Sequence, residues 1–158
     1  MDLVTFAPRF PRPGETVVGN SFLTYAGGKG ANQAVAVSRM GARSAMVGRV
    51  GGDIFGPQLL DGLTTAGVDI TGVGINPNES SGIAVIGIDE TAQNCITQIL
   101  GANDTCDPAE AAAVKHRLPS AAALLLQLEV SIDLSLEVAR EAKTLGVMVM
   151  LDPGPVRP

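Results

Sequence analysis

Two continuous apolar runs near the end of the chain constrain its fold more than any other feature. They are "AAALLLQL" (121–128) and "GVMVMLD" (146–152), and residues 132–145 between them have a helical pattern. Continuous rather than alternating hydrophobicity is typical of strands covered on both faces, as in a parallel sheet. The order strand, helix, strand predicts a βαβ unit with a right-handed crossover. The expected fold class is therefore α/β.

Earlier segments repeat this alternation of strands and helices. The Ala/Val-rich residues 30–40 predict a helix that Gly41 ends, and "RSAMVGRVG" (43–51) predicts a short strand. Asp53 is expected to cap the following helix, whose apolar residues fall on one face. In "DPAE" (107–110), Asp at the N-cap, Pro at the first position and Glu at the third predict another helix start.

Other stretches have the features of antiparallel strands. "GETVVGNSFLTYA" (14–26) is rich in β-favouring residues, and in residues 81–100 two strand patterns flank the polar turn "DETAQN". Residues 68–75 are expected to add another strand. We expect a small antiparallel sheet beside the main domain. Its exposed edges and its apolar face should cover something or pair with another copy.

Charge and composition exclude several classes of function. Eleven Lys and Arg against sixteen Asp and Glu give a net charge of −5 with no basic stripe, which argues against nucleic-acid binding. A mean hydropathy of +0.27, short apolar runs and a start without an apolar leader predict a cytoplasmic protein that does not enter membranes. Cys95 and Cys106 are expected to be buried, reduced thiols. His116 is expected to have no functional role.

A glycine cluster precedes the first predicted helix, in "TYAGGKGANQAVAVSRMGA" (24–42). It is not a P-loop, because Gly30 follows Gly28-Lys29 where that motif needs a hydroxyl residue. It is not a dinucleotide fingerprint either, because the third glycine of that motif is replaced by Gln33.

What remains of the cluster is a bare backbone at a helix N-terminus, with Lys29 and Asn32 beside it. Such a backbone exposes N–H donors to a close ligand, and Asn32 offers both a donor and an acceptor. This set suits a polar ligand with several hydroxyl groups. A tight turn followed by close helix packing is an equally good reading of the residues alone.

The octapeptide "GGKGANQA", followed by Gly41 and Gly51, resembles the first signature of the PfkB sugar kinases, and the ribokinase branch of that family most closely. Further segments resemble that branch in the same order and extend the resemblance over essentially the whole chain: "PRPGETVVGN" (11–20), "GGD" (51–53), "GVDIT" (67–71), "SGIAVI" (81–86), "GAND" (101–104), "LLQLE" (125–129) and "DPGP" (152–155).

The resemblance implies a ribokinase-like fold, in which helices flank a central, mostly parallel sheet and a small β-sheet lid closes over the sugar. Residues 1–158 would form part of one such domain. Lid strands are expected within about 3–26 and 68–100, and the α/β part at 27–67 and 101–158. In ribokinases the lid also forms the contact of a homodimer.

The resemblance also implies which residues bind the substrate. An acid near the start of ribokinases, a glycine loop and a strand-end carboxylate contact the sugar, and they match Asp2, Gly28, Lys29, Gly30, Asn32 and Glu129. The chemistry is suitable because sugar hydroxyls donate hydrogen bonds that a carboxylate accepts. Without the resemblance, Glu129 would read as a solvated strand-end acid and Asp2 as part of a disordered terminus.

The chain departs from the family at both ends. Met1 directly precedes Asp2, where ribokinases have a full strand, and the printed sequence stops at "LDPGPVRP". The N-x-x-E motif and the D-T-x-G-A-G-D motif, whose last aspartate is the catalytic base, are expected beyond that point. No catalytic or metal-binding residue is therefore assigned. ATP, Mg²⁺ and a monovalent cation such as K⁺ are expected for the full-length family member and not for this chain alone.

The expected function follows from the resemblance and from these departures. The chain is expected to be the N-terminal part of an ATP-dependent sugar kinase, a transferase that converts ribose to ribose 5-phosphate, and to be inactive by itself. Two alternatives stay open. One is a non-catalytic fragment that binds sugar or pairs through its lid, and the other is a product with too little sheet to fold cooperatively.

Overall fold

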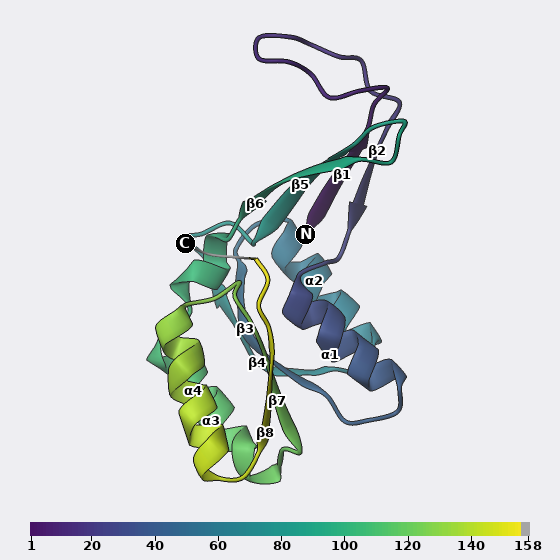
Figure 1. Ribbon diagram of the computed structural model, residues 1–158. Coiled ribbons are helices and arrows are strands. Elements are labelled where there is room, and N and C mark those ends of the chain that lie inside the picture. The colour runs from purple at the N-terminus through teal and green to yellow at the C-terminus, as the bar shows by residue number, and fades with distance from the viewer. Residues whose placement is uncertain (156–158) are drawn as a thin grey trace.

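The computed structural model describes residues 1–155, which form an α/β body and a lid that projects from it (Figure 1). Residues 156–158 of the expected α/β part lie outside the described residues. None of the helices within residues 1–155 is long and apolar enough to cross a membrane. The body contains short 3-10 turns at Gly101–Thr105 and Leu118–Ser120 and the helices α1 (Lys29–Arg39), α2 (Phe55–Thr65), α3 (Pro108–Arg117) and α4 (Ile132–Thr144).

The strands of the body form two parallel pairs. In the first pair β3 (Ala45–Gly51) lies beside β4 (Asp69–Asn76), and in the second β7 (Ala123–Gln127) lies beside β8 (Met148–Asp152). Helix α2 connects the first pair and α4 the second, so each pair is a strand, helix, strand unit. The predicted α/β fold class and its parallel strands are confirmed.

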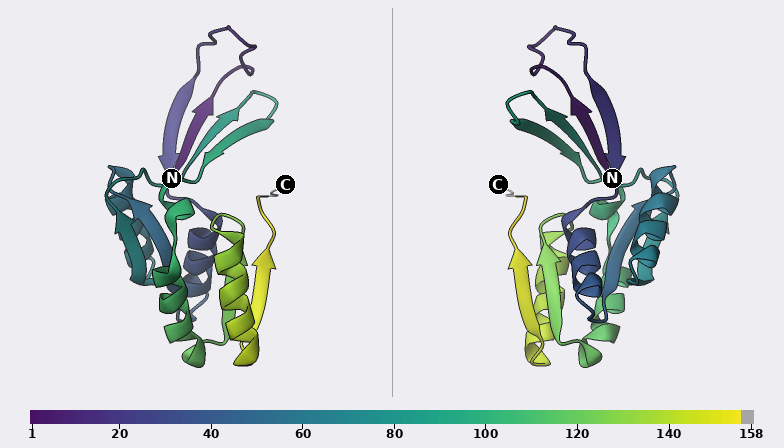
Figure 2. Two further views of the ribbon diagram at one scale, coloured as in Figure 1. Left: turned by 90° about the vertical axis from the view of Figure 1, so that its left-hand side faces the viewer. Right: turned by 90° about the vertical axis from the view of Figure 1, so that its right-hand side faces the viewer.

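A seam separates the two strand pairs. Within residues 1–155 no ladder of hydrogen bonds joins β3 to β7, and the pairs lie at opposite edges of the body (Figure 2). Helix α1 spans the seam because it packs against both β3 and β7. Helix α3 packs against the first pair and against α4, which packs against the second. Helix packing therefore holds the body together across this seam.

The lid is a four-stranded sheet whose strands come from two distant parts of the chain. Its order is β2 (Ser21–Tyr25), β1 (Asp2–Phe6), β5 (Ile83–Ile88) and β6 (Asn94–Ile99). The outer strands run antiparallel to their neighbours, whereas β1 and β5 are parallel. In both side views the sheet rises from one end of the body (Figure 2). The predicted hairpin over 81–100 is confirmed as β5 and β6.

The strand expected at 68–75 exists, but it does not belong to the lid. It is β4, which pairs with β3 in the body, so the lid range that we expected at 68–100 begins too early. The physical reason is the short α2 connection, which returns the chain parallel to β3 as in a βαβ unit. Strand character in the sequence did not indicate which sheet the strand would join.

Two expectations about burial are wrong. The apolar run at 146–152 forms β8, but Met150 is 49% and Leu151 54% exposed because β8 is an edge strand and α4 covers one side of the pair. Cys95, on β6, is exposed rather than buried, whereas Cys106 is half-buried. Both thiols are free, and burial raises the pKa of Cys106 to about 11, with a smaller contribution from Glu110.

Local sequence signals place the helices as expected. Gly41 ends α1 with a positive φ of 87°, which a residue without a Cβ adopts readily. Asp107 and Glu110 form a complete capping box at the start of α3. The core beneath α1 consists of Ala34, Leu63 and Val68, and it fixes the helix against α2.

A compact polar junction ties the lid to the body. The Asp53 carboxylate accepts hydrogen bonds from Phe55 N, Gly56 N and Ser81 N, and from Ser81 Oγ at 2.7 Å. Ser81 Oγ in turn accepts the Gly51 N–H at 3.0 Å, and Ser81 is fully buried. Burial acts to raise the pKa of Asp53, but these hydrogen bonds together lower it below its usual value. The junction therefore fixes the start of β5 against the end of β3.

Candidate functional site

Polar side chains gather where β7 and β8 end. Gln127 is the last residue of β7, Glu129 follows two positions later, and Asp152 is the last residue of β8. The carboxyl ends of parallel strands meet at one edge of a sheet, and open α/β sheets bind ligands there. The N-terminus of α1 reaches the same edge, since Lys29 bonds to Glu129.

Glu129 joins three parts of the molecule. Its Oε2 accepts the backbone N–H of Lys29 at 2.9 Å, and its Oε1 accepts a hydrogen bond from Gln98 Nε2 at 2.8 Å. Lys29 belongs to the glycine loop and Gln98 to the lid strand β6, whereas Glu129 belongs to the body. The half-buried carboxylate is therefore held from two sides.

The glycine loop lies between two carboxylates. A Cβ at Gly27 would overlap the carboxylate of Asp2, so this position excludes any larger side chain while Asp2 keeps its place. Gly28 has a φ of 95°, and a Cβ there would lie 3.9 Å from Glu129 Oε2. Consecutive glycines thus let the chain pass close to both Asp2 and Glu129.

A chain of side-chain amides continues the site along α1. Gln127 Nε2 donates to Gln33 Oε1, and Gln33 Nε2 donates to Asp152 Oδ2 at 3.4 Å. A Cβ at Gly30 would lie only 2.8 Å from Gln127 Oε1, so the absence of a side chain there makes room for this network. The two strand ends are therefore linked to the first turns of α1.

The structure brings most of the predicted site residues together. Asp2 contacts the glycine loop, Glu129 bonds to its Lys29, and Gly30 contacts Gln127. Asn32 lies on the first turn of α1, three residues after Lys29 and so on the same helix face. Its side chain is exposed and donates no hydrogen bond to any residue of the range 1–155. A sugar-binding role for these residues stays a prediction.

The sequence analysis missed four residues of this cluster, namely Gln33, Gln98, Gln127 and Asp152. Asp152 ends an apolar run just as Glu129 follows one, so the same strand-end argument could have found it. Gln98 had no comparable signal, because its bond to Glu129 depends on how the lid sits over the body. It has the appearance of an ordinary polar residue in a hairpin.

The described residues do not form a metal centre. Within residues 1–155, no group of three or more His, Cys, Asp or Glu side chains is arranged to hold a metal ion. Divalent magnesium prefers several oxygen ligands around one point. The described residues therefore offer no protein-only cluster of such side chains for the Mg²⁺ that the resemblance implies for the full-length family member.

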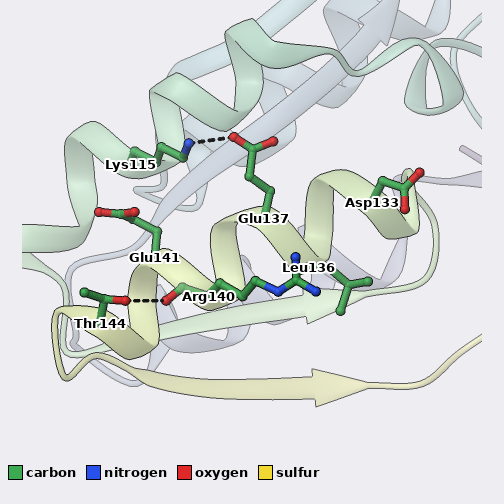
Figure 3. Close-up of a pocket in the computed structure, with 7 residues that line it drawn as sticks. All are labelled: Lys115, Asp133, Leu136, Glu137, Arg140, Glu141 and Thr144. Atoms are coloured by element: carbon green, nitrogen blue, oxygen red, sulfur yellow. Dashed lines mark hydrogen bonds and ion pairs between the residues drawn. The ribbon is translucent and has the colours of Figure 1, made fainter.

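A second hollow lies between α3 and α4 and shares no residue with the cluster at the strand ends. Its volume is about 520 Å³, and it is lined by Lys115 of α3 and by side chains along α4 (Figure 3). Lys115 pairs with Glu137 at 2.6 Å in this groove. Because its charges of opposite sign are interspersed, the groove has no single-sign field that would select a ligand.

Comparison with known sequences identifies what the chain is similar to. Residues 1–156 match the family described as pfkB family carbohydrate kinase. A ribokinase of Bacillus subtilis (strain 168) is 39% identical over 158 residues, which are 100% of this chain and 54% of the relative. A ribokinase of Schizosaccharomyces pombe is 38% identical over 166 residues, or 99% of this chain and 51% of the relative. The chain thus spans about half the length of these curated relatives.

Solved structures of related proteins have the same fold as this chain. A ribokinase from Giardia lamblia superposes with a TM-score of 0.90 at 32% identity, over 99% of this chain and 48% of the other. A ribokinase from Arabidopsis thaliana, described as complexed with ribose and ATP, gives a TM-score of 0.83 at 32% identity. That match covers 97% of this chain and 50% of the other. The predicted lid and α/β architecture is that of these proteins.

Proposed function

Because the chain belongs to the pfkB family of carbohydrate kinases, we propose that it supplies the sugar-binding part of a ribokinase-type enzyme. That enzyme would transfer a phosphate group from ATP to ribose and form ribose 5-phosphate. One observation carries the proposal: the carboxylates of Asp2 and Glu129 both lie against the glycine loop 27–30, at neighbouring residues. The relative described with ribose and ATP supports the choice of both substrates.

The chemistry of the cluster matches a polyhydroxylated ligand. Each carboxylate offers several acceptor positions to hydroxyl donors, and the Lys29 ammonium offers donors to hydroxyl oxygens. Hydrogen bonds to charged groups contribute about 1.5–3 kcal/mol each, so a few such contacts suffice for a small sugar. We propose Asp2, Gly28, Lys29, Gly30, Asn32 and Glu129 as the residues that contact it.

The 158-residue chain by itself should bind sugar without phosphorylating it. Phosphoryl transfer depends on positioning of the nucleotide and on stabilising the transferred charge. The catalytic aspartate and the nucleotide site implied by the resemblance are not among the matched residues. An ATP-consuming sugar kinase belongs where ATP is abundant, which supports a cytoplasmic location.

The test combines binding and turnover on the purified chain. Isothermal titration calorimetry with D-ribose should give saturable binding to one site. An assay with ribose, ATP, Mg²⁺ and K⁺ should give no ribose 5-phosphate above a no-protein control. Absence of sugar binding would contradict the binding proposal. Turnover that persists after contaminating kinases are removed would contradict the inactivity proposal.

A specific feature favours a second function for the same chain, namely pairing through the lid. The outer strands β2 and β6 expose large apolar side chains: Phe22, Leu23, Tyr25, Ile96 and Ile99. Exposed apolar residues on edge strands favour association with another sheet. We propose that the lid mediates a homodimer, which sedimentation equilibrium should detect as twice the chain mass. A monomer at all concentrations would contradict it.

A further inference from the structure

Gln98 is a lid residue that reaches into the candidate sugar site. It lies on β6, where its side chain is exposed and its Nε2 donates to Glu129 Oε1 at 2.8 Å. The partner is the same carboxylate whose Oε2 accepts the Lys29 N–H. Glu129 thus has one oxygen fixed by the glycine loop and the other by the lid.

The register of the lid sheet places Gln98 in line with another residue of the site. Asp2 on β1 is paired with Ala84 on β5, and Ala84 is paired with Gln98 on β6. Residues in one such cross-strand row share a face of the sheet. Asp2 and Gln98 therefore lie on the same face, two strand spacings or roughly 10 Å apart.

Ala84 places only a methyl group between these two polar side chains. Its methyl group is the smallest side chain that a residue other than glycine can place in the row. Asp2 reaches the glycine loop at Gly27, and Gln98 reaches Glu129, so both side chains extend toward the body. A sugar ring is narrower than the distance between β1 and β6. The row of Asp2, Ala84 and Gln98 can therefore span one ring.

The hydrogen bond leaves part of the Gln98 amide free to act on a ligand. The side-chain amide has two N–H donors and a carbonyl oxygen, and the bond to Glu129 uses one donor. A carboxylate that is held by the glycine loop alone could rotate about its side-chain bonds. With Gln98 in place, its second oxygen is fixed toward the lid.

We propose that Gln98 is a positioning residue for sugar recognition: it orients the Glu129 carboxylate and carries the closing lid onto the bound sugar. The inference rests on the proposed function, because it concerns the same site. Gln98 would therefore determine how strongly the site prefers a sugar that places a hydroxyl group at the Glu129 carboxylate over one that does not. The Gln98–Glu129 bond draws the lid and the body together.

The experiment compares Gln98→Ala with Gln93→Ala in the full 158-residue chain. Gln93 lies in the turn of the same hairpin, is exposed and is remote from the site residues, so it controls for loss of a lid amide. The first readout needs no sugar: hydrogen exchange of the Lys29 amide, measured by NMR. We expect Gln98→Ala to accelerate it at least threefold, because Glu129 is no longer held, and Gln93→Ala to leave it unchanged.

The second readout is the affinity for D-ribose. Gln98→Ala should raise Kd at least fivefold, whereas Gln93→Ala should change it less than twofold. A third variant, Gln98→Glu, keeps the shape but faces Glu129 with a second carboxylate. Two adjacent carboxylates repel when both are ionised and share a proton at lower pH. The affinity of Gln98→Glu relative to the wild type should therefore be poor at pH 8 and recover toward pH 5, which a purely structural role would not produce.

Each outcome decides a separate point. An unchanged Lys29 exchange rate in Gln98→Ala overturns the inference, whether or not sugar binds. Faster exchange with an unchanged ribose Kd overturns the role in sugar recognition. If the wild type binds no sugar, the proposed function fails, and the role of Gln98 in sugar recognition fails with it. The exchange rate still shows whether Gln98 holds Glu129.

Discussion

The Glu129 carboxylate accepts the backbone N–H of Lys29 at 2.9 Å, although the two residues are 100 positions apart in the chain. One partner opens α1, which spans the seam in the body, and the other follows β7. The candidate site therefore exists only when β7 and β8 are packed against α1. The binding properties of the site depend on individual side-chain atoms, which single substitutions can remove.

Replacing Glu129 by the isosteric glutamine should weaken sugar binding without unfolding the protein. Glu129→Gln removes a charged acceptor, and a charged hydrogen bond is worth about 1.5–3 kcal/mol, so the ribose Kd should rise at least about tenfold. Titration calorimetry measures this change. Glu90→Gln, in the exposed turn of the lid, is the matched control and should bind normally. Equal affinities for the two variants would contradict a direct role for Glu129.

A methyl group at Gly27 should displace Asp2. Gly27→Ala introduces a Cβ that overlaps the Asp2 carboxylate, so that side chain must move away from the glycine loop. Overpacking of this kind costs about 1–3 kcal/mol of unfolding free energy, and ribose affinity should fall with it. Gly62→Ala is the control, since its Cβ would lie 3.8 Å from Ala26 and should stabilise α2 by up to about 1 kcal/mol. Urea denaturation measures the free energy of unfolding of Gly27→Ala and Gly62→Ala. Similar changes in the two variants would contradict the argument.

The junction at Asp53 should make stability depend on pH in the acid range. Its pKa in the folded protein is below the usual value, so its contribution is fully present above about pH 4 and is lost as pH falls through the folded pKa. Asp53→Asn should lower the free energy of unfolding at pH 7 by about 1–3 kcal/mol, because the charge is lost and the oxygen that accepts the Ser81 N–H is replaced by an NH2 donor.

The pH series distinguishes this effect from a general acid effect. The gap in unfolding free energy between the wild type and Asp53→Asn should narrow from pH 7 to pH 3, as measured by urea denaturation. Asp61→Asn, at an exposed position on α2, should track the wild type throughout. A gap of constant size over the whole range would contradict the assignment to ionised Asp53.

Among the charged residues of the body, Arg49 should be the one whose substitution lowers the free energy of unfolding most. Its guanidinium, on β3, donates to both oxygens of Glu110, and the two side chains are 16% and 8% exposed. Arg49→Met leaves Glu110 buried without its partner, which costs about 3–5 kcal/mol. Arg49→Met combined with Glu110→Gln should recover part of that loss. The exposed pair Arg9–Glu15 is the comparison, and Arg9→Met should leave the unfolding midpoint in the same urea series nearly unchanged.

Local signals in the sequence predicted the helices and their ends well. The capping box of Asp107 and Glu110 and the glycine end of α1 at Gly41 involve neighbours within a few residues, so pattern and structure agree. The glycine loop and Glu129 were also predicted, because the resemblance supplied both positions. Their mutual hydrogen bond was not, since it depends on packing across the body.

What could not be predicted is long-range in origin. Residues 69–76 have strand character, but the choice between lid and body depends on how α2 returns the chain to β3. The apolar residues of β8 indicate a buried strand, yet the strand lies at an edge. Gln98 acquires its role only when the lid sits above Glu129. In each case the deciding partner is far away in the sequence.

The seam between the two strand pairs also determines how the body would respond to force. Within a pair, parallel strands share a ladder of hydrogen bonds that must break together under shear. Across the seam in residues 1–155, side chains of α1 on one side and of α3 and α4 on the other connect the pairs instead. A force that pulls β4 and β8 in opposite directions would therefore separate the two strand pairs from each other while each pair stays intact. The helices would slide before either ladder ruptures.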